Sequence, residues 1–129
     1  MSAPRFKHFV TTFALLVSVI TSGTAAAHAQ LQSQLPAADS TVSSPRELHL
    51  QFSEGVEEKF TKISITSVTP SGKKMVEPVP SVATDPGDKK LLIVTPAAPL
   101  AAGEYKIEWH AVSVDTHKSE GSYRFTVSP

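Results

Sequence analysis

"GEYKIEWHAVSV" occupies residues 103–114, and apolar and polar side chains alternate along most of this stretch. One side of the alternation carries Tyr105, Ile107, Trp109 and Ala111, and the other carries Lys106, Glu108 and His110. Successive side chains of a β-strand point to opposite faces, so this pattern predicts a strand with one buried face. We expect Trp109 to be the central aromatic residue of the core.

Other short segments of the same kind lie on both sides of this strand in the sequence. They are ELHLQF (47–52), FTKISITSV (60–68), KLLIVTP (90–96) and GSYRFTV (121–127). The spacers between them are rich in Pro, Gly, Ser and Asp, which are the residues that favour turns. Short alternating segments separated by turns are typical of a two-layer sandwich. We therefore predict one all-β domain, a small antiparallel β-sandwich without helices.

The first segment of the chain has the three parts of an export signal. Arg5 and Lys7 form a basic start, residues 9–20 are mostly apolar, and the alanines at 25–27 match the pattern that signal peptidase recognises. The apolar part is too short to span a bilayer, which takes about 20 residues. We predict that residues 1–27 are removed and that the rest is exported without membrane insertion.

Removal of this segment leaves residues 28–129, with 10 basic and 12 acidic side chains and no cysteine. Phosphate contacts need clustered positive charge, so this balance excludes a strongly basic nucleic-acid-binding protein. Without cysteine the domain has no disulfide, no thiolate metal site and no cysteine nucleophile. Its stability must come from its core, and any metal must be bound through nitrogen, oxygen or thioether ligands.

Asp115 and His117 form a D-x-H pair directly after the strand at 103–114. In an extended chain both side chains would leave the same face, roughly 6–7 Å apart at the backbone, and could converge on one ion. Together with Ser113 they also contain the three residue types of a hydrolytic triad. Along a strand, however, Ser113 and His117 would lie about 13 Å apart, whereas a triad needs about 3 Å. We therefore expect no hydrolase.

His28 becomes the first residue if signal peptidase cuts after Ala27. Its free α-amine and its ring Nδ1 can then chelate one metal ion, and Asp115 and His117 complete a set of three nitrogens and one oxygen. Such a set suits Cu(II) in a tetragonal geometry. A cut after Ala29 is the alternative, because the small-residue pattern recurs there, and it would remove His28 together with the chelate.

The sequence resembles the CopC family of periplasmic copper-resistance and copper-carrier proteins. The resemblance covers essentially the whole of residues 28–129, beginning with the histidine that follows the alanine-rich cleavage site. It is carried by LPAADSTV (35–42), LHLQFSEGV (48–56), TPAAPLAAGEYKIEWHAVSVDTH (95–117) and GSYRFTV (121–127). The resemblance implies a cupredoxin-like or immunoglobulin-like Greek-key β-sandwich or barrel in the periplasm, and we expect a monomer.

The resemblance also implies a site and a role. Cu(II) would be held by His28, Asp115 and His117, with Glu54 of the F-S-E motif as a nearby partner that orients a ligand nitrogen. The protein would sequester or transfer copper and would not be an enzyme. A CopD-like copper transport protein of the inner membrane is the implied partner.

One departure from the family pattern concerns Cu(I). Studied members carry a methionine-rich segment with a histidine, whereas the corresponding residues 65–87 contain only Met75 and no histidine. One thioether does not build a Cu(I) site. We therefore predict a carrier of Cu(II) alone, with Met75 as a loop or gap-filling residue.

Two other functions remain open. Some copper mono-oxygenases also bind copper at an N-terminal histidine, although here Asp115 would fill a fourth position and the chain is short for a carbohydrate-binding face. A metal-free immunoglobulin-like adhesion or scaffold domain would bind no copper and would tolerate His28→Ala. The remaining histidines of the domain, His49 and His110, are expected on the outward faces of strands.

Overall fold

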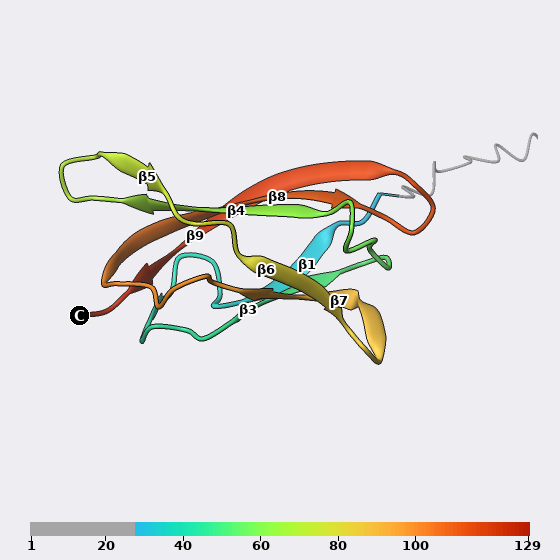
Figure 1. Cartoon of the computed structure of the whole chain (residues 1–129), viewed down its shortest axis with the longest axis horizontal. Helices are drawn as coiled ribbons and strands as arrows, with labels where there is room; N and C mark the ends of the chain where they lie inside the picture. The colour runs from blue at the N-terminus through green and yellow to red at the C-terminus, as the bar shows by residue number, and fades with distance from the viewer. Residues whose placement is uncertain (1–27) are drawn as a thin grey trace, which may run out of the picture.

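The computed structural model describes residues 28–129, and its regular elements are all β-strands (Figure 1). They are β1 (Leu31–Leu35), β2 (Thr41–Val42), β3 (Leu48–Phe52), β4 (Lys62–Val68), β5 (Lys74–Val76), β6 (Ser81–Asp85), β7 (Asp88–Thr95), β8 (Gly103–Val112) and β9 (Lys118–Val127). The predicted signal segment, residues 1–27, lies outside the described residues. Within the described range, no helix is long and apolar enough to cross a membrane.

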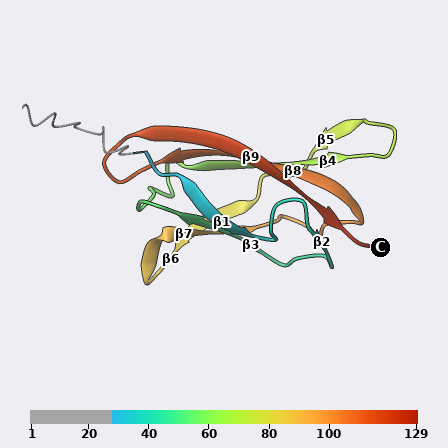
Figure 2. The same cartoon turned by 180° about the vertical axis from the view of Figure 1, so that it is seen from behind.

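The strands form two sheets that lie in two layers, as Figure 2 shows from the opposite side. One sheet has the order β1-β3-β7-β6, and the other has the order β2-β9-β8-β4-β5. The chain crosses between the sheets several times, for example from β3 to β4 and from β7 to β8, as in Greek-key sandwiches. The predicted all-β sandwich is confirmed, except that the short pairing of β2 with β9 is parallel.

The core between the two sheets contains the apolar faces that the alternation predicted. In β8 the buried side chains are Tyr105, Ile107, Trp109 and Ala111. Trp109 contacts Phe52 of β3 edge-on, with the ring centroids 5.2 Å apart and the ring planes at 80°. Because β3 and β8 belong to different sheets, Trp109 joins the two layers, as expected of the central aromatic residue.

The two histidines that we expected on the surface lie on outward strand faces. His110 is exposed on β8, where its Nδ1 lies 3.2 Å from Glu120 Oε2 of β9. His49 of β3 is half-buried, and its Nε2 lies 2.7 Å from Glu47 Oε1. Both side chains pair with a neighbouring glutamate and point away from the core.

Met75 differs from the prediction. It lies on β5, a short strand at the edge of the five-stranded sheet, and 53% of its surface is exposed. It is therefore neither a loop residue nor a gap-filling residue of the core. A three-residue edge strand leaves its side chains without a covering layer, which explains the exposure.

The longest hairpin of the fold positions the predicted site. β8 and β9 pair without interruption from Gly103 opposite Val127 to Val112 opposite Lys118. The loop of residues 113–117 closes this hairpin at one end of the sandwich. The described chain begins beside that loop, and its C-terminus lies at the opposite end (Figures 1 and 2).

Candidate metal centre

The β8–β9 loop is a tight reversal of the chain, so the spacing that an extended chain would give Asp115 and His117 does not apply. Thr116 N donates to Ser113 O at 2.8 Å, and Ser113 N donates to His117 O at 2.9 Å. Thr116 adopts a φ of 75°, in the left-handed region that a β-branched residue rarely enters. Residues 114–116 lie between the hydrogen-bonded Ser113 and His117, and a turn followed by one left-handed residue is a common form of such a three-residue hairpin loop. This reversal brings the side chains on either side of Thr116 together.

Asp115 and His117 meet directly in this loop. His117 Nδ1 lies 3.2 Å from Asp115 Oδ1, and both side chains are about half exposed. The carboxylate also accepts a hydrogen bond from the hydroxyl of Ser113. That hydrogen bond, followed by the contacts with His117, holds the pKa of Asp115 below its usual range despite some desolvation. Asp115 is therefore an ionised carboxylate at neutral pH.

Ser113 lies much closer to its neighbours than the strand estimate of about 13 Å suggested. Its Oγ lies 3.2 Å from the carbonyl oxygen of His117, because the turn folds the chain back. The spacing of about 13 Å between these residues, which holds for an extended strand, therefore does not apply to this loop. The arrangement nevertheless differs from a triad, in which the nucleophile donates to the imidazole. Here the Ser113 hydroxyl donates to the carboxylate, and Ser113 is fully buried.

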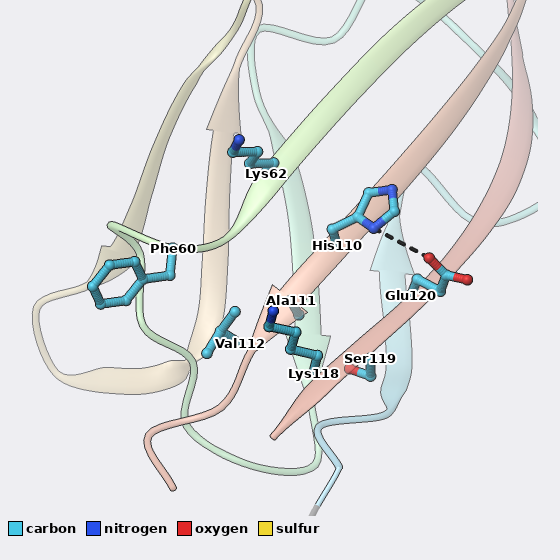
Figure 3. Close-up of a pocket in the computed structure, with 8 residues that line it drawn as sticks. All are labelled: Phe60, Lys62, His110, Ala111, Val112, Lys118, Ser119 and Glu120. Atoms are coloured by element: carbon cyan, nitrogen blue, oxygen red, sulfur yellow. Dashed lines mark ion pairs between the residues drawn. The ribbon is translucent and has the colours of Figure 1, made fainter. Parts of the chain in front are cut away.

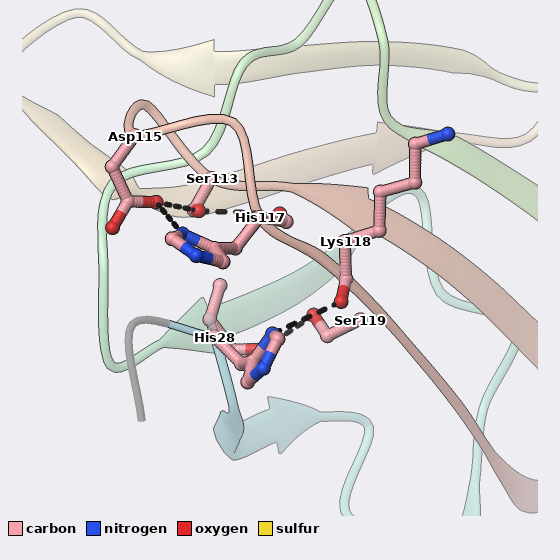
Figure 4. Close-up of polar contacts among 7 residues, drawn as sticks. His28, Ser113, Asp115, His117, Lys118 and Ser119 are labelled. Atoms are coloured by element: carbon pink, nitrogen blue, oxygen red, sulfur yellow. Dashed lines mark hydrogen bonds and ion pairs between the residues drawn. The ribbon is translucent and has the colours of Figure 1, made fainter. Parts of the chain in front are cut away.

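His28 lies beside His117, although the two residues come from distant parts of the chain. Their ring centroids are 5.3 Å apart with the planes at 83° (Figure 4). His28 Nδ1 lies 3.1 Å from the carbonyl oxygen of Lys118, and since a carbonyl can only accept, Nδ1 carries the proton in this contact. A chelate through Nδ1 therefore requires the His28 ring to turn away from Lys118.

The two residues after His28 fix its position. Ala29 is fully buried, and its carbonyl oxygen accepts a hydrogen bond of 2.6 Å from Ser119 Oγ of β9. Gln30 N donates to Ser53 Oγ at 2.9 Å, and Ser53 N donates to Gln30 O at 2.8 Å. Neither serine is predictable from the sequence, because a single serine in or beside a strand forms no recognisable motif.

Glu54 lies near this loop, because the residues on either side of it are hydrogen-bonded to the N-terminal segment and to the loop. Ser53 is bonded to Gln30, and Gly55 O accepts a hydrogen bond of 2.9 Å from Val114 N in the β8–β9 loop. The Glu54 side chain is exposed, and the structure gives it no hydrogen bond or ion pair with another described residue. Glu54 is thus placed at the rim of the site but is not engaged in it.

His28, Asp115 and His117 are neighbours, but they do not form a finished metal-binding group. In the described part of the chain, no three His, Asp or Glu side chains are arranged so that they could hold a metal ion. The two imidazole rings meet edge to face, and the His28 Nδ1 faces a carbonyl group. The uncleaved sequence also places the His28 nitrogen in a peptide bond with Ala27. The α-amine of the predicted donor set exists only after cleavage.

A surface depression of about 600 Å³ lies next to the β8–β9 loop on the outer face of the five-stranded sheet (Figure 3). It is lined by Phe60, Lys62, His110, Ala111, Val112, Lys118, Ser119 and Glu120. None of the three predicted metal ligands contributes to its wall. The predicted ligands are thus grouped at the β8–β9 loop, with His28 beside it, and not in this hollow.

Comparison with known proteins identifies the family of the chain. The CopC domain matches residues 31–128. Copper resistance protein C of Escherichia coli is 42% identical over 105 residues, which is 80% of this chain and 83% of that protein. Copper resistance protein C of Pseudomonas syringae pv. tomato is 39% identical over 121 residues, covering 92% of this chain and 94% of its own. The crystal structure of PcoC, a methionine-rich copper resistance protein from Escherichia coli, matches with a TM-score of 0.71 at 39% identity, over 78% of this chain and 99% of that one. The chain is a member of the CopC family.

Proposed function

We propose that the processed protein binds Cu(II) in the periplasm and sequesters or transfers it. The relatives in the family are named as copper resistance proteins, which supports a role in copper handling. The observation that carries the proposal is the contact of the His28 and His117 rings beside the Asp115 carboxylate. Two imidazoles and a carboxylate from opposite ends of the chain have no need to meet at a surface loop for the sake of packing. They supply the nitrogen and oxygen donors that Cu(II) prefers.

The ligands in this proposal are the α-amine and Nδ1 of His28, the imidazole of His117 and the carboxylate of Asp115. In the structure, His117 Nδ1 lies 3.2 Å from Asp115 Oδ1. An ion bound to Nε2 of this ring would lie on the side that faces away from Asp115, because the two ring nitrogens point in nearly opposite directions. Binding of one ion by both side chains therefore requires this contact to open, so that the Asp115 carboxylate turns toward the metal.

Cleavage after Ala27 is part of the proposal, and the burial of Ala29 supports it. A cut after Ala29 would discard a fully buried residue whose carbonyl oxygen is hydrogen-bonded to Ser119. The domain would lose part of its core along with His28. The folded unit therefore favours residues 28–129 as the mature protein and residues 1–27 as the signal.

The finer features of the proposal are an outer role for Glu54 and binding of Cu(II) alone. Glu54 is exposed between Ser53 and Gly55, whose backbones bond to the N-terminal segment and to the β8–β9 loop. In this proposal its charge would offset that of the ion, and its oxygens would orient a ligand nitrogen. Met75 is the only methionine after the signal, and a single thioether does not retain Cu(I). The implied recipient is a CopD-like inner-membrane protein, and the carrier acts as a monomer.

The test is a Cu(II) titration of protein that begins at His28, with electron paramagnetic resonance as the spectroscopic readout. His28→Ala and His117→Ala should each weaken binding by more than the roughly 10- to 100-fold that loss of an outer partner costs. Each should also remove nitrogen couplings from the spectrum. His49→Ala and His110→Ala are matched controls, since both histidines pair with glutamates on outward strand faces and contact none of the proposed ligands. Equal losses in the controls, or none in His117→Ala, would contradict the proposed site.

A further inference from the structure

The first residues of the domain are bound to both sheets through two serine side chains. Ser119 belongs to β9 in the five-stranded sheet, and Ser53 follows β3 in the four-stranded sheet. Ser119 Oγ donates to the Ala29 carbonyl at 2.6 Å, and Ser53 Oγ accepts from the Gln30 amide at 2.9 Å. The Ala29 carbonyl and the Gln30 amide belong to one peptide group, and the side chain of Ala29 next to it is buried. The segment before β1 is thus held at consecutive residues from two sides.

Such attachment is unusual at the start of a chain, because terminal residues commonly fray. Ordering one residue costs conformational entropy, and a metal that must order its own ligand loses the corresponding affinity. This loss is greatest for a chelate made by the first residue of a chain, because that residue is the least ordered. A carbonyl fixed directly after that residue removes much of its freedom before the metal arrives.

Two adjacent residues of β9 contact the N-terminal segment at two adjacent points. The Lys118 carbonyl accepts from the His28 ring at 3.1 Å, and the Ser119 hydroxyl donates to the Ala29 carbonyl (Figure 4). The same strand begins immediately after His117. The contact at Ser119 therefore sets where His28 lies relative to His117.

We propose that Ser119 is a positioning residue of the copper site, acting with Ser53 to order the N-terminal histidine before copper binds. This inference rests on the proposed function. Ser119 does not contact the ion; it holds the Ala29 carbonyl so that the His28 amine and ring stay within reach of His117. The strand itself does not depend on the hydroxyl, since the backbone of β9 is paired with β8 along its whole length. Loss of the hydroxyl therefore loosens the terminus and leaves the sandwich folded.

The experiment compares protein beginning at His28 with its Ser119→Ala, Ser119→Thr and Ser122→Ala variants. Ser122 is the matched control, because it is exposed on the same strand, away from the N-terminal segment. Ser119→Ala should weaken Cu(II) binding about three- to tenfold, the effect of one lost hydrogen bond. It should also broaden or split the nitrogen couplings in the electron paramagnetic resonance spectrum, while the protein stays folded at the temperature of the titration. Ser119→Thr keeps the hydroxyl and should restore both properties, and Ser122→Ala should leave both unchanged.

A second readout on the copper-free protein separates this inference from the proposed function. Amide exchange at Gln30 should be faster in Ser119→Ala and unchanged in Ser122→Ala. If the parent protein binds no Cu(II), the proposed function fails, and the exchange rates still decide whether Ser119 orders the terminus. Unchanged exchange and unchanged Cu(II) binding in Ser119→Ala would overturn the inference. A loss of binding that only follows unfolding of Ser119→Ala at the temperature of the titration would overturn it as well.

Discussion

Tyr105 and Tyr123 differ in the hydrogen bonding of their hydroxyl groups. Tyr105 donates its hydroxyl to the Ala101 carbonyl at 2.6 Å, a contact that resembles the tyrosine corner of immunoglobulin-type sandwiches. The Tyr123 hydroxyl is buried and has no hydrogen-bond partner among the described residues. Burial raises the pKa of both side chains. The difference between them is therefore one of hydrogen bonding, and it makes a paired test possible.

Tyr105→Phe should lower the free energy of unfolding by about 1 kcal/mol, because it removes a hydrogen bond and leaves a carbonyl unpaired. Tyr123→Phe should leave that free energy unchanged or raise it by up to about 1 kcal/mol, since it removes a buried hydroxyl without a partner. Urea denaturation of both variants measures the difference. Equal destabilisation by the two substitutions would show that the Tyr123 hydroxyl has a partner in solution.

The Asp115 carboxylate should respond to its nearest donor. Ser113→Ala removes the hydrogen bond that lowers the Asp115 pKa most, so the pKa should rise toward the ordinary value of about 3.9. When the pKa of a carboxyl group is lower in the folded than in the unfolded protein, the group stabilises the fold at pH values above its unfolded pKa. This stabilisation is lost as the pH falls through the folded pKa. Carboxyl-carbon NMR titration measures the pKa directly. An unchanged value in Ser113→Ala would rule out Ser113 as its main cause.

At the scale of the elements, all five predicted strands are present, and all four that were missed lie at sheet edges. The missed strands are β1, β2, β5 and β6. An edge strand pairs on one side only, and its side chains are less completely covered, so it needs no strict alternation of apolar residues. The polar stretch LQSQL of β1 illustrates this, with no fully buried residue in it. Alternation of apolar and polar residues reveals a strand only when one face of that strand is buried. The side chains of these four strands are barely buried.

The loop at 113–117 escaped prediction for a different reason. Three-residue hairpin loops are recognised by a glycine at the left-handed position, and here Thr116 occupies it. The D-x-H pattern and the histidine at the predicted new terminus pointed to the residues of the candidate site, and the structure makes them neighbours. The reversal that joins Asp115 to His117 was not, because it is imposed by the pairing of β8 with β9. The hydrogen bonds of Ser53 and Ser119 were missed because they form only when the fold brings distant segments of the chain together.

The β8–β9 hairpin has one tight point where Gly121 faces Trp109. A Cβ atom at Gly121 would lie 2.5 Å from Trp109 Cζ2, which is too close, because this atom belongs to a rigid indole ring that packs between the two sheets. Gly121→Ala should therefore lower the free energy of unfolding by about 1–3 kcal/mol and alter the near-ultraviolet signal of Trp109. Gly87→Ala is the control, because its nearest contact would be Asp85 Oδ2 at 3.4 Å. Equal stability of the two variants would contradict this packing.

At the scale of the whole molecule, the proposed site joins the first residue of the mature chain to its last hairpin. Amine and imidazole nitrogens bind copper only when deprotonated, so Cu(II) affinity should fall steeply between about pH 8 and about pH 5. Competition titrations at several pH values measure this dependence. A carboxylate-only site would keep its affinity over most of that range, since carboxyl groups titrate near pH 4. A flat profile would exclude the nitrogen ligands.

The role of signal cleavage can be isolated by blocking a single amine. Two purified forms should be compared by Cu(II) titration and electron paramagnetic resonance: one that begins at His28 with a free amine and one that begins at His28 with this amine acetylated. The sandwich is the same in both, but only the first has a free amine on His28. We predict tight Cu(II) binding with couplings from three nitrogens in the first form, and much weaker binding with one nitrogen fewer in the second. Equal affinity and identical couplings in the two forms would contradict the proposed chelate.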